Sequence, residues 1–181
     1  MRQLCGSRRD CVPICGNDAP DVPCVVTSRL AGQNAITVDM DSKCIFCGND
    51  GGLKVYGDDR CRVVIADEAF VGFCRVIWTA HVREITDLST AERSHLMEVV
   101  FAVESALRAL LRPHKMNLAS LGNQVPHLHW HVVPRFISDS HFPEPVWGVR
   151  QRDPAPHAWP AGFASALAQR LASCHDERRS Q

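Results

Sequence analysis

The stretch that decides the fold is His127-Leu128-His129-Trp130-His131-Val132-Val133-Pro134, where three histidines occupy every second position. Successive side chains of a β-strand point to opposite faces, so His127, His129 and His131 would share one face, about 6–7 Å apart at each step. The apolar residues between them would face the other way. The alternation therefore predicts a strand with one packing face and one face whose imidazoles can act as nucleophile, acid, base or metal ligand.

The sequence around this stretch predicts an antiparallel sheet. Short runs rich in β-branched and apolar residues alternate with turn signals, as is typical of paired strands. Asp58-Asp59 suggests a hairpin turn between the first two runs, and Gly122-Asn123 suggests a turn between the last two. The five expected strands cover residues 53–56, 62–66, 74–78, 116–121 and 127–135.

Two helices are expected beside the sheet, which makes the fold class α+β. Ser89-Thr90-Ala91-Glu92 has the form of a capping box, and apolar residues then repeat at helical spacing until Pro113. This pattern predicts one long amphipathic helix of about six turns. Near the C-terminus, Pro160 is expected to open a final helix that runs through Leu171.

The chain divides into three parts by composition. Residues 1–40 mix Arg, Cys, Pro, Asp and Gly without a sustained period, which indicates an irregular or disordered extension. Residues 41–137 hold the regular pattern of strands and helix and form the expected domain. Residues 138–181 form an arm rich in proline and tryptophan, followed by the final helix. The arm includes Trp147, which either shapes a pocket or simply packs.

Composition excludes several function classes. The 181 residues favour one domain with extensions, and 20 basic residues balance 20 acidic ones. The chain therefore has no excess of positive charge that would favour nucleic acid or an anionic membrane as a partner. The nine cysteines are an odd number, and no apolar run near the N-terminus resembles a signal peptide or a membrane span. We expect a cytoplasmic protein with reduced thiols.

Residues 116–135 resemble the histidine triad (HIT) superfamily, whose pattern is His-apolar-His-apolar-His-apolar-apolar. The likeness extends from Cys44 to about Phe136 and includes the order of strands and helix. It is strongest to bacterial members that resemble diadenosine tetraphosphate hydrolases. The resemblance implies a nucleotide hydrolase or transferase that acts at the α-phosphate, folded around a five-stranded antiparallel sheet and paired into a homodimer. Its substrate would be a dinucleoside polyphosphate or a nucleoside phosphoramidate.

The chemistry of such a reaction assigns different work to two of the histidines. Attack on phosphorus needs a neutral nitrogen nucleophile whose other ring nitrogen is held by a hydrogen bond. The central His129 fits this role best, and the resemblance implies a covalent nucleotidyl-histidine that water then hydrolyses. His131, on the same strand face, can contact the phosphate or handle the proton of the leaving group.

The resemblance also implies nucleotide-binding residues. Asn123 and Gln124 stand where the family has Gln followed by a small residue, and both amides can donate to phosphate oxygens. Gln124 is therefore also assigned to the catalytic set. Asp67 matches the position that binds the ribose hydroxyls, although it is as typical of a turn, and Asn117 would support the phosphate-binding turn. The family's histidine before the third strand is absent, because Phe73 follows Gly72. Arg135, after Pro134, is more typical of a solvated charge at a strand end than of a phosphate ligand.

Cys44-Ile45-Phe46-Cys47 is a CxxC pair, which can supply half of a structural zinc site. One branch of the HIT superfamily completes this site with a histidine after the third strand and the first histidine of the triad. The resemblance therefore implies structural Zn²⁺ bound by Cys44, Cys47, His81 and His127. A redox pair and a pair of ordinary thiols remain the alternatives. The Gly-rich residues 48–52 argue against the redox alternative, which requires a helix after the pair.

Two other functions remain open at this point. The chain can be a nucleotide-binding regulatory module with little turnover, although the presence of both His129 and His131 favours an enzyme. The triad itself can also bind a metal.

Overall fold

The structure is a computed structural model that describes residues 43–66, 69–153 and 159–179. The expected extension 1–40 and Asp67 lie outside the described residues. Within the described residues, no helix combines the length and the apolar character that crossing a membrane requires.

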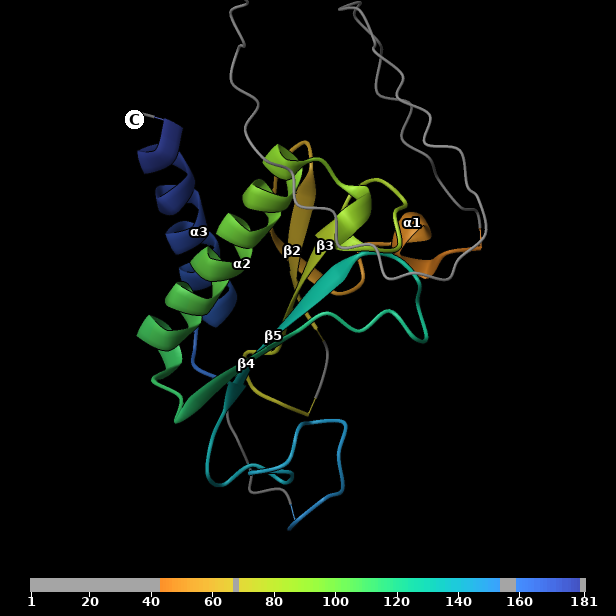
Figure 1. Cartoon of the computed structure of the whole chain (residues 1–181). Helices are drawn as coiled ribbons and strands as arrows, with labels where there is room; N and C mark the ends of the chain where they lie inside the picture. The colour runs from red at the N-terminus through yellow and green to blue at the C-terminus, as the bar shows by residue number, and fades with distance from the viewer. Residues whose placement is uncertain (1–42, 67–68, 154–158, 180–181) are drawn as a thin grey trace, which may run out of the picture. The chain divides into compact units, whose positions relative to one another are not determined.

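Five strands form one antiparallel sheet in the order β1-β2-β3-β5-β4 (Figure 1). The order places β5, which carries the histidines, inside the sheet between β3 and β4. This confirms the five-stranded antiparallel sheet that the sequence predicts. The strands are β1 (Leu53–Gly57), β2 (Cys61–Ile65), β3 (Cys74–Trp78), β4 (Lys115–Ala119) and β5 (His129–Arg135).

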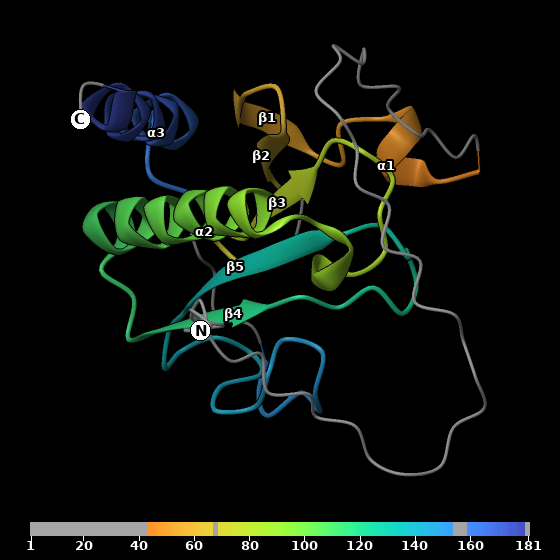
Figure 2. The same cartoon turned by 45° about the horizontal axis from the view of Figure 1, so that its top comes forward.

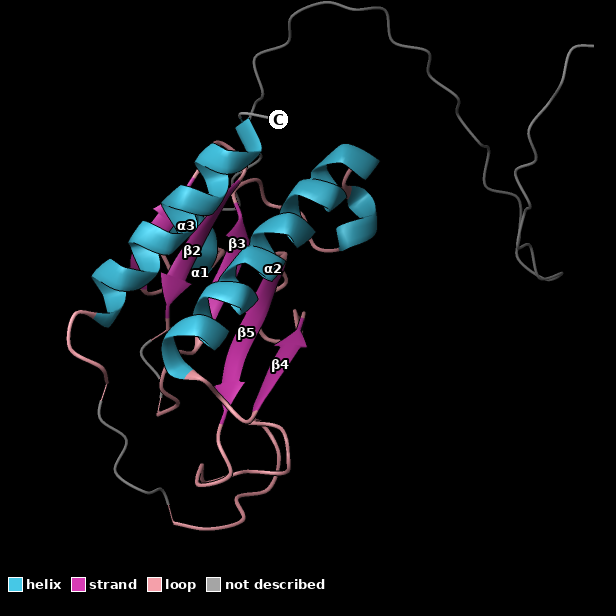
Figure 3. Cartoon of the chain, turned by 90° about the vertical axis from the view of Figure 1, so that its left-hand side faces the viewer, coloured by secondary structure: helices cyan, strands magenta, loops and turns pink. Residues whose placement is uncertain are grey.

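Two helices, α2 (Thr90–Leu111) and α3 (Phe163–Arg179), cover one face of the sheet (Figures 2 and 3). The predicted capping box begins α2, because the Ser89 amide donates to a Glu92 carboxylate oxygen at 2.8 Å and the Ser89 hydroxyl accepts from the Glu92 amide at 3.3 Å. Two short elements complete the fold, namely α1 (Ile45–Gly48), a single turn that contains Cys47 and has Cys44 as its N-cap, and the 3-10 turn η1 (Ile85–Asp87).

The core lies between the two helices and the sheet. The apolar repeat of α2 supplies side chains such as Leu96 and Leu107, which pack against Val76 and Val132 of the sheet and Leu167 of α3. All five are fully buried. Because each such side chain contributes about 1.5–3 kcal/mol when it leaves water, this layer supplies most of the free energy that holds the helices on the sheet. The opposite face of the sheet is left for other contacts.

The predicted boundaries of β4, β5 and the last helix are wrong. β5 starts at His129, so His127 precedes the strand. The amide of Leu128 donates to the Val82 carbonyl at 2.7 Å, and the Leu128 carbonyl accepts from the Trp78 amide at 3.1 Å. These bonds tie Leu128 to Trp78, the last residue of β3, and to Val82 in the loop after it. A loop of residues 120–128, rather than a tight Gly122-Asn123 turn, joins β4 to β5. The last helix starts at Phe163, because Pro160 accepts a turn hydrogen bond from the Phe163 amide, and it continues past Leu171 to Arg179.

Candidate active site and metal centre

The histidine face of the sheet forms the floor of a cavity of about 550 Å³. His129 and His131 reach it from β5, and Arg75 reaches it from the neighbouring strand β3, where it pairs with His131. The segment around α1, the loop 120–128 and the arm that follows β5 supply the walls. The wall residues that matter below are Phe46, Asn123, Gln124 and Trp147.

His129 is held in one tautomer. Its Nδ1 lies 2.6 Å from the carbonyl oxygen of His127, which can only accept, so Nδ1 carries the proton. The other ring nitrogen, Nε2, therefore keeps its lone pair. Burial lowers the pKa of His129, and the nearby charge of Arg75 lowers it further, while the bond to His127 opposes the shift. The ring is thus neutral and oriented, as a nitrogen nucleophile must be.

His131 is held by packing. Its ring centre lies 4.8 Å from that of His129, 4.9 Å from Trp147 and 5.5 Å from Phe73. Its Nδ1 is buried and has no hydrogen-bond partner among the described residues. Burial, followed by the charges of His129 and Arg75, lowers the pKa of His131 to about 3, so the ring is neutral at physiological pH.

The two amides expected to bind phosphate both line the cavity. Asn123 and Gln124 lie in the loop 120–128, which is tied to β5 by a hydrogen bond of 2.9 Å from the Ser120 hydroxyl to the His129 carbonyl. Their side chains can therefore donate to an oxygen held above His129.

Asn117 lies beyond the cavity wall. It pairs with Val133 in the sheet, and its Oδ1 accepts a hydrogen bond of 2.7 Å from Arg135. Arg135 is the residue that the sequence suggested to be solvated, yet it is 1% exposed. It also forms a bidentate pair with Asp139, with nitrogen–oxygen distances of 2.9 and 3.0 Å. A buried guanidinium needs such partners because desolvation is otherwise costly.

The Arg135 cluster fixes the arm that carries Trp147. Arg135 donates to the Glu144 carbonyl at 2.8 Å, and Asp139 accepts from the amides of His141 and Phe142 at 3.0 and 2.6 Å. These bonds fold residues 136–147 back against the histidine face. Trp147 then contacts His131, so the arm of the same chain shapes the cavity, which is one of the two roles expected for it.

Four predicted ligands meet beside the active site. The Sγ atom of Cys44 lies 3.4 Å from Nδ1 of His127, and Sγ of Cys47 lies 3.4 Å from Nδ1 of His81 and 3.6 Å from Nδ1 of His127. A tetrahedral Zn²⁺ with ordinary bond lengths places sulfur and nitrogen ligands about 3.5 Å apart. The four donor atoms lie within 4.8 Å of one another, so this cluster can hold a metal ion.

The tautomer of His127 fits this role. Its Nε2 lies 2.7 Å from the Trp78 carbonyl and must donate, so Nδ1 presents a lone pair to the cysteines. Burial lowers the pKa of His127, which favours the neutral ring that a metal requires. The carbonyl of His127 also accepts the hydrogen bond that His129 Nδ1–H donates. The four candidate metal ligands and His129 are thus joined through one residue, His127.

Comparison with known proteins agrees with this geometry. The sequence of residues 50–137 matches the family model that describes the HIT domain. The crystal structure of a histidine triad protein from Bradyrhizobium japonicum is 30% identical, with a TM-score of 0.59, over 67% of this chain and 92% of that one. The chain belongs to the HIT family. The protein named hit of Bacillus subtilis is 26% identical over 72% of this chain and 95% of its own length. A Zn-bound HIT protein from Mycobacterium smegmatis shares the fold, with 23% identity and a TM-score of 0.54 over 75% of this chain and 97% of that one.

Sequence reasoning missed two parts of this HIT site. Ile45 and Phe46 were read only as the spacer of the CxxC pair, yet both line the cavity, and the ring of Phe46 lies 4.9 Å from that of His129. Arg75 was read only as part of a strand. A charged residue within the apolar run Cys74–Trp78 was the signal that could have found it.

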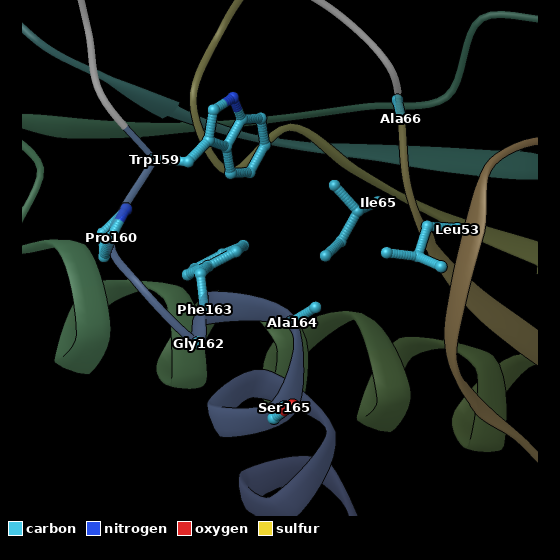
Figure 4. Close-up of a pocket in the computed structure, with 9 residues that line it drawn as sticks. All are labelled: Leu53, Ile65, Ala66, Trp159, Pro160, Gly162, Phe163, Ala164 and Ser165. Atoms are coloured by element: carbon cyan, nitrogen blue, oxygen red, sulfur yellow. The ribbon is translucent and has the colours of Figure 1, made fainter.

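A second cavity, of about 460 Å³, lies apart from the HIT site (Figure 4). It opens between β1, β2 and the start of α3, where Trp159 and Phe163 face Leu53 and Ile65. None of the described residues that line it is titratable. This second cavity is therefore apolar and offers no acid, base or metal ligand among its described lining residues.

Proposed function

We propose that the protein is a nucleotide hydrolase or transferase that acts at the α-phosphate of a nucleotide through a covalent intermediate on His129. The observation that carries this proposal is the 2.6 Å bond from His129 Nδ1 to the His127 carbonyl. That bond fixes the tautomer in which Nε2 has a lone pair, and the ring lines the cavity. Among the described residues that line the cavity, His131 is also neutral, but its Nδ1 has no hydrogen-bond partner that would fix its tautomer.

The reaction proceeds in two displacements. Nε2 of His129 forms a bond to the α-phosphorus as the bond from phosphorus to the leaving group breaks, and the leaving group takes that electron pair. A water molecule, or another acceptor, then attacks the same phosphorus, and the pair of the broken P–N bond returns to Nε2. The substrate belongs to the dinucleoside polyphosphates or the nucleoside phosphoramidates.

The surrounding residues bind and orient the nucleotide. Gln124 and Asn123 donate to phosphate oxygens, and Asp67 binds the ribose hydroxyls. Asn117 supports this set indirectly, through its bond to the buried Arg135. His131 is neutral in the free protein and binds the phosphate as a hydrogen-bond donor, and the negative charge of the bound phosphate raises its pKa so that it can protonate the leaving group.

The test is to trap the intermediate. The purified chain is mixed with a panel of dinucleoside polyphosphates and nucleoside phosphoramidates labelled at the α-phosphate, and the reaction is quenched rapidly. We expect label on His129 by peptide mass spectrometry, and neither label nor turnover in His129→Ala. Turnover of His129→Ala near the wild-type rate would exclude the proposal. Tight nucleotide binding by the wild type without any adduct would instead support a regulatory nucleotide-binding module.

We further propose that the metal cluster holds a structural Zn²⁺, which would supply no chemistry to the reaction. The donor set, its spacing and the tautomer of His127 support zinc, as does the zinc bound by the fold relative from Mycobacterium smegmatis. Both cysteines must be thiolates, which favours a reducing compartment such as the cytoplasm. We expect one zinc per chain, retained in His129→Ala and lost in Cys44→Ala. The reverse pattern would place the metal on the triad.

We also propose that two copies of the chain form a homodimer, as the HIT resemblance implies. Large apolar side chains that remain exposed on one copy, such as Phe101 at 54% and Ile137 at 61%, are consistent with a covered surface. Light scattering coupled to gel filtration is expected to give twice the mass of one chain, and a monomer at micromolar concentration would contradict this.

A further inference from the structure

The α1 segment, residues 44–51, belongs both to the metal cluster and to the active-site cavity. Cys44 and Cys47 are two of the four candidate metal ligands, whereas Phe46 lines the cavity, with its ring centre 4.9 Å from that of His129. The helix in this segment is a single turn of four residues. Helices shorter than about 12–15 residues are marginal in water by themselves. The position of the segment therefore depends on its contacts with the rest of the fold.

Arg62 of β2 is bonded to the main chain of the α1 segment. Its Nη2 donates to the carbonyl oxygens of Phe46 at 2.6 Å and Asn49 at 3.0 Å, and its Nε donates to that of Asp50 at 3.0 Å. Carbonyls at the end of a helix lack a partner within the helix, so an arginine can satisfy them from outside. The Arg62 side chain is 13% exposed, which keeps these bonds largely out of water.

Arg62 stands in the same row of the sheet as His129. It pairs with Ile77 of β3, and Ile77 pairs with His129 of β5. Residues directly opposite each other on paired strands share a face, so all three lie on the histidine face. Phe46 packs on Ile77, the middle residue of this row. A shift of the α1 segment would therefore move Phe46 relative to His129 and, at the same time, move the cysteines relative to the histidine ligands.

We propose that Arg62 is a positioning residue that holds the α1 segment on the histidine face, and so sets the Phe46 wall of the cavity and the cysteine half of the metal cluster together. The part that concerns the nucleotide rests on the proposed function. Arg62 neither lines the cavity nor belongs to the four candidate ligands, so it acts through the main chain that it bonds. Arg75 donates to one further carbonyl of the segment, that of Gly51 at 3.2 Å, and this bond remains when Arg62 is replaced.

Hydrogen–deuterium exchange of the full chain tests the position of the segment directly. The amides of Cys47, Gly48 and Asn49 donate within the turn at 3.0–3.1 Å. Arg62→Met keeps a long side chain without donors, so we expect these amides to exchange at least about tenfold faster, because the turn alone is marginal. The amides of β5 should exchange as in the wild type. A general loss of stability would instead speed exchange in β5 as well. If Arg62→Met does not fold, Arg62→Lys should show a smaller change that is equally local.

Two affinities test the consequences for the sites. Binding of AMP and GMP is measured by calorimetry with zinc in excess, so that loss of metal does not contribute. A segment that holds the competent position about one tenth of the time raises the apparent Kd about tenfold, which is the change expected in Arg62→Met for the nucleotide that the wild type binds. The affinity for zinc, measured by competition with a chelator, should fall about 10- to 100-fold.

Two further variants separate positioning from the loss of a charge. Arg62→Lys keeps the charge but lacks the planar fork that reaches several carbonyls, so it should restore only part of each affinity. Arg60→Met is the matched control, since Arg60 is an exposed arginine just before β2 whose ion pair with Asp59 is 4.0 Å long. It should change neither affinity by more than about twofold, because exposed pairs contribute little.

The outcomes separate this inference from the proposed function. Unchanged exchange of the three α1 amides in folded Arg62→Met would overturn the role of Arg62, and so would equal losses of affinity in Arg62→Met and Arg60→Met. A wild type that binds neither nucleotide and forms no adduct on His129 would overturn the proposed function. Exchange of the α1 amides and the zinc affinity would then still decide the role of Arg62.

Discussion

The two faces of β5 are stabilised in different ways. On the face toward α2, Val132 is packed among apolar side chains that carry no directional bonds. On the opposite face, His129 and Arg135 depend on specific hydrogen bonds of 2.6–3.0 Å. Alternate residues of one strand thus have different tasks, because one set packs the core and the other set forms the candidate site. Substitutions on the first face should change stability without changing the chemistry, and substitutions of the histidines on the second face should mainly change the chemistry.

The largest effect on stability is expected on the helix face. Leu107 is fully buried between α2 and the sheet, so Leu107→Ala removes apolar contacts and leaves a cavity. We expect the free energy of unfolding in urea to fall by about 2–5 kcal/mol. The fraction that remains folded should still transfer label to His129. His129→Ala is the converse, because it should lower the free energy of unfolding by only about 1–3 kcal/mol, through the lost bond to the His127 carbonyl, yet abolish label transfer. A variant of Leu107 that stays folded but fails to react would show that the two faces are coupled.

A smaller effect on stability is expected from the Arg135 cluster on the histidine face. Asp139→Asn keeps the shape of the side chain but removes the charge that pairs with the buried Arg135, which should cost about 1–3 kcal/mol. The arm of residues 136–147 should then be cut faster by proteases. Asp153→Asn is the control, since its pair with Arg150 is exposed and should contribute less than about 0.5 kcal/mol. Equal effects of the two variants on stability would show that the pair of Asp139 with the buried Arg135 contributes no more than an exposed pair.

The next effect is a dependence of stability on pH. The pKa of His131 is about 3 in the folded protein, whereas an unfolded histidine titrates near 6.5. The unfolded state therefore binds the extra proton between these values, and stability is lost as pH falls from about 6.5 toward 3. One such group contributes a slope of at most about 1.4 kcal/mol per pH unit. His131→Phe should flatten the dependence of unfolding free energy between pH 5 and 6, and an unchanged slope would contradict the buried neutral ring.

The smallest change in stability is expected at the rim of the cavity. Trp147 is 49% exposed and contacts His131, so Trp147→Ala should change unfolding free energy by less than about 0.5 kcal/mol. It should nevertheless weaken nucleotide binding severalfold, because the ring forms part of the cavity wall. Trp159→Ala is the matched control, since Trp159 is 41% exposed and lines the other cavity. Nucleotide affinity that falls equally in both variants would show a general effect of losing a tryptophan.

Local pattern predicted most of the fold, and its errors have physical causes. The alternation in β5 and the apolar repeat of α2 were read correctly because each depends only on the period of the element. The start of β5 was placed two residues early, since its boundary depends on the bonds of Leu128 to Val82 and Trp78. Arg135 was judged solvated because its partners, Asn117 and Asp139, become neighbours only when the chain folds.

The sequence by itself determined the alternation that separates a packing face from a histidine face, and the residue types that can bind a metal or attack phosphorus. The roles of the three histidines were predicted from the resemblance, and the tertiary structure decided the tautomer and the surroundings of each ring. His127 donates Nε2–H to Trp78 and turns Nδ1 toward the cysteines, while its carbonyl fixes His129 with Nε2 left to react. The tautomer of His127, the burial of the rings and the effect of the Arg75 charge arise from contacts between segments distant in the sequence, which no local spacing encodes.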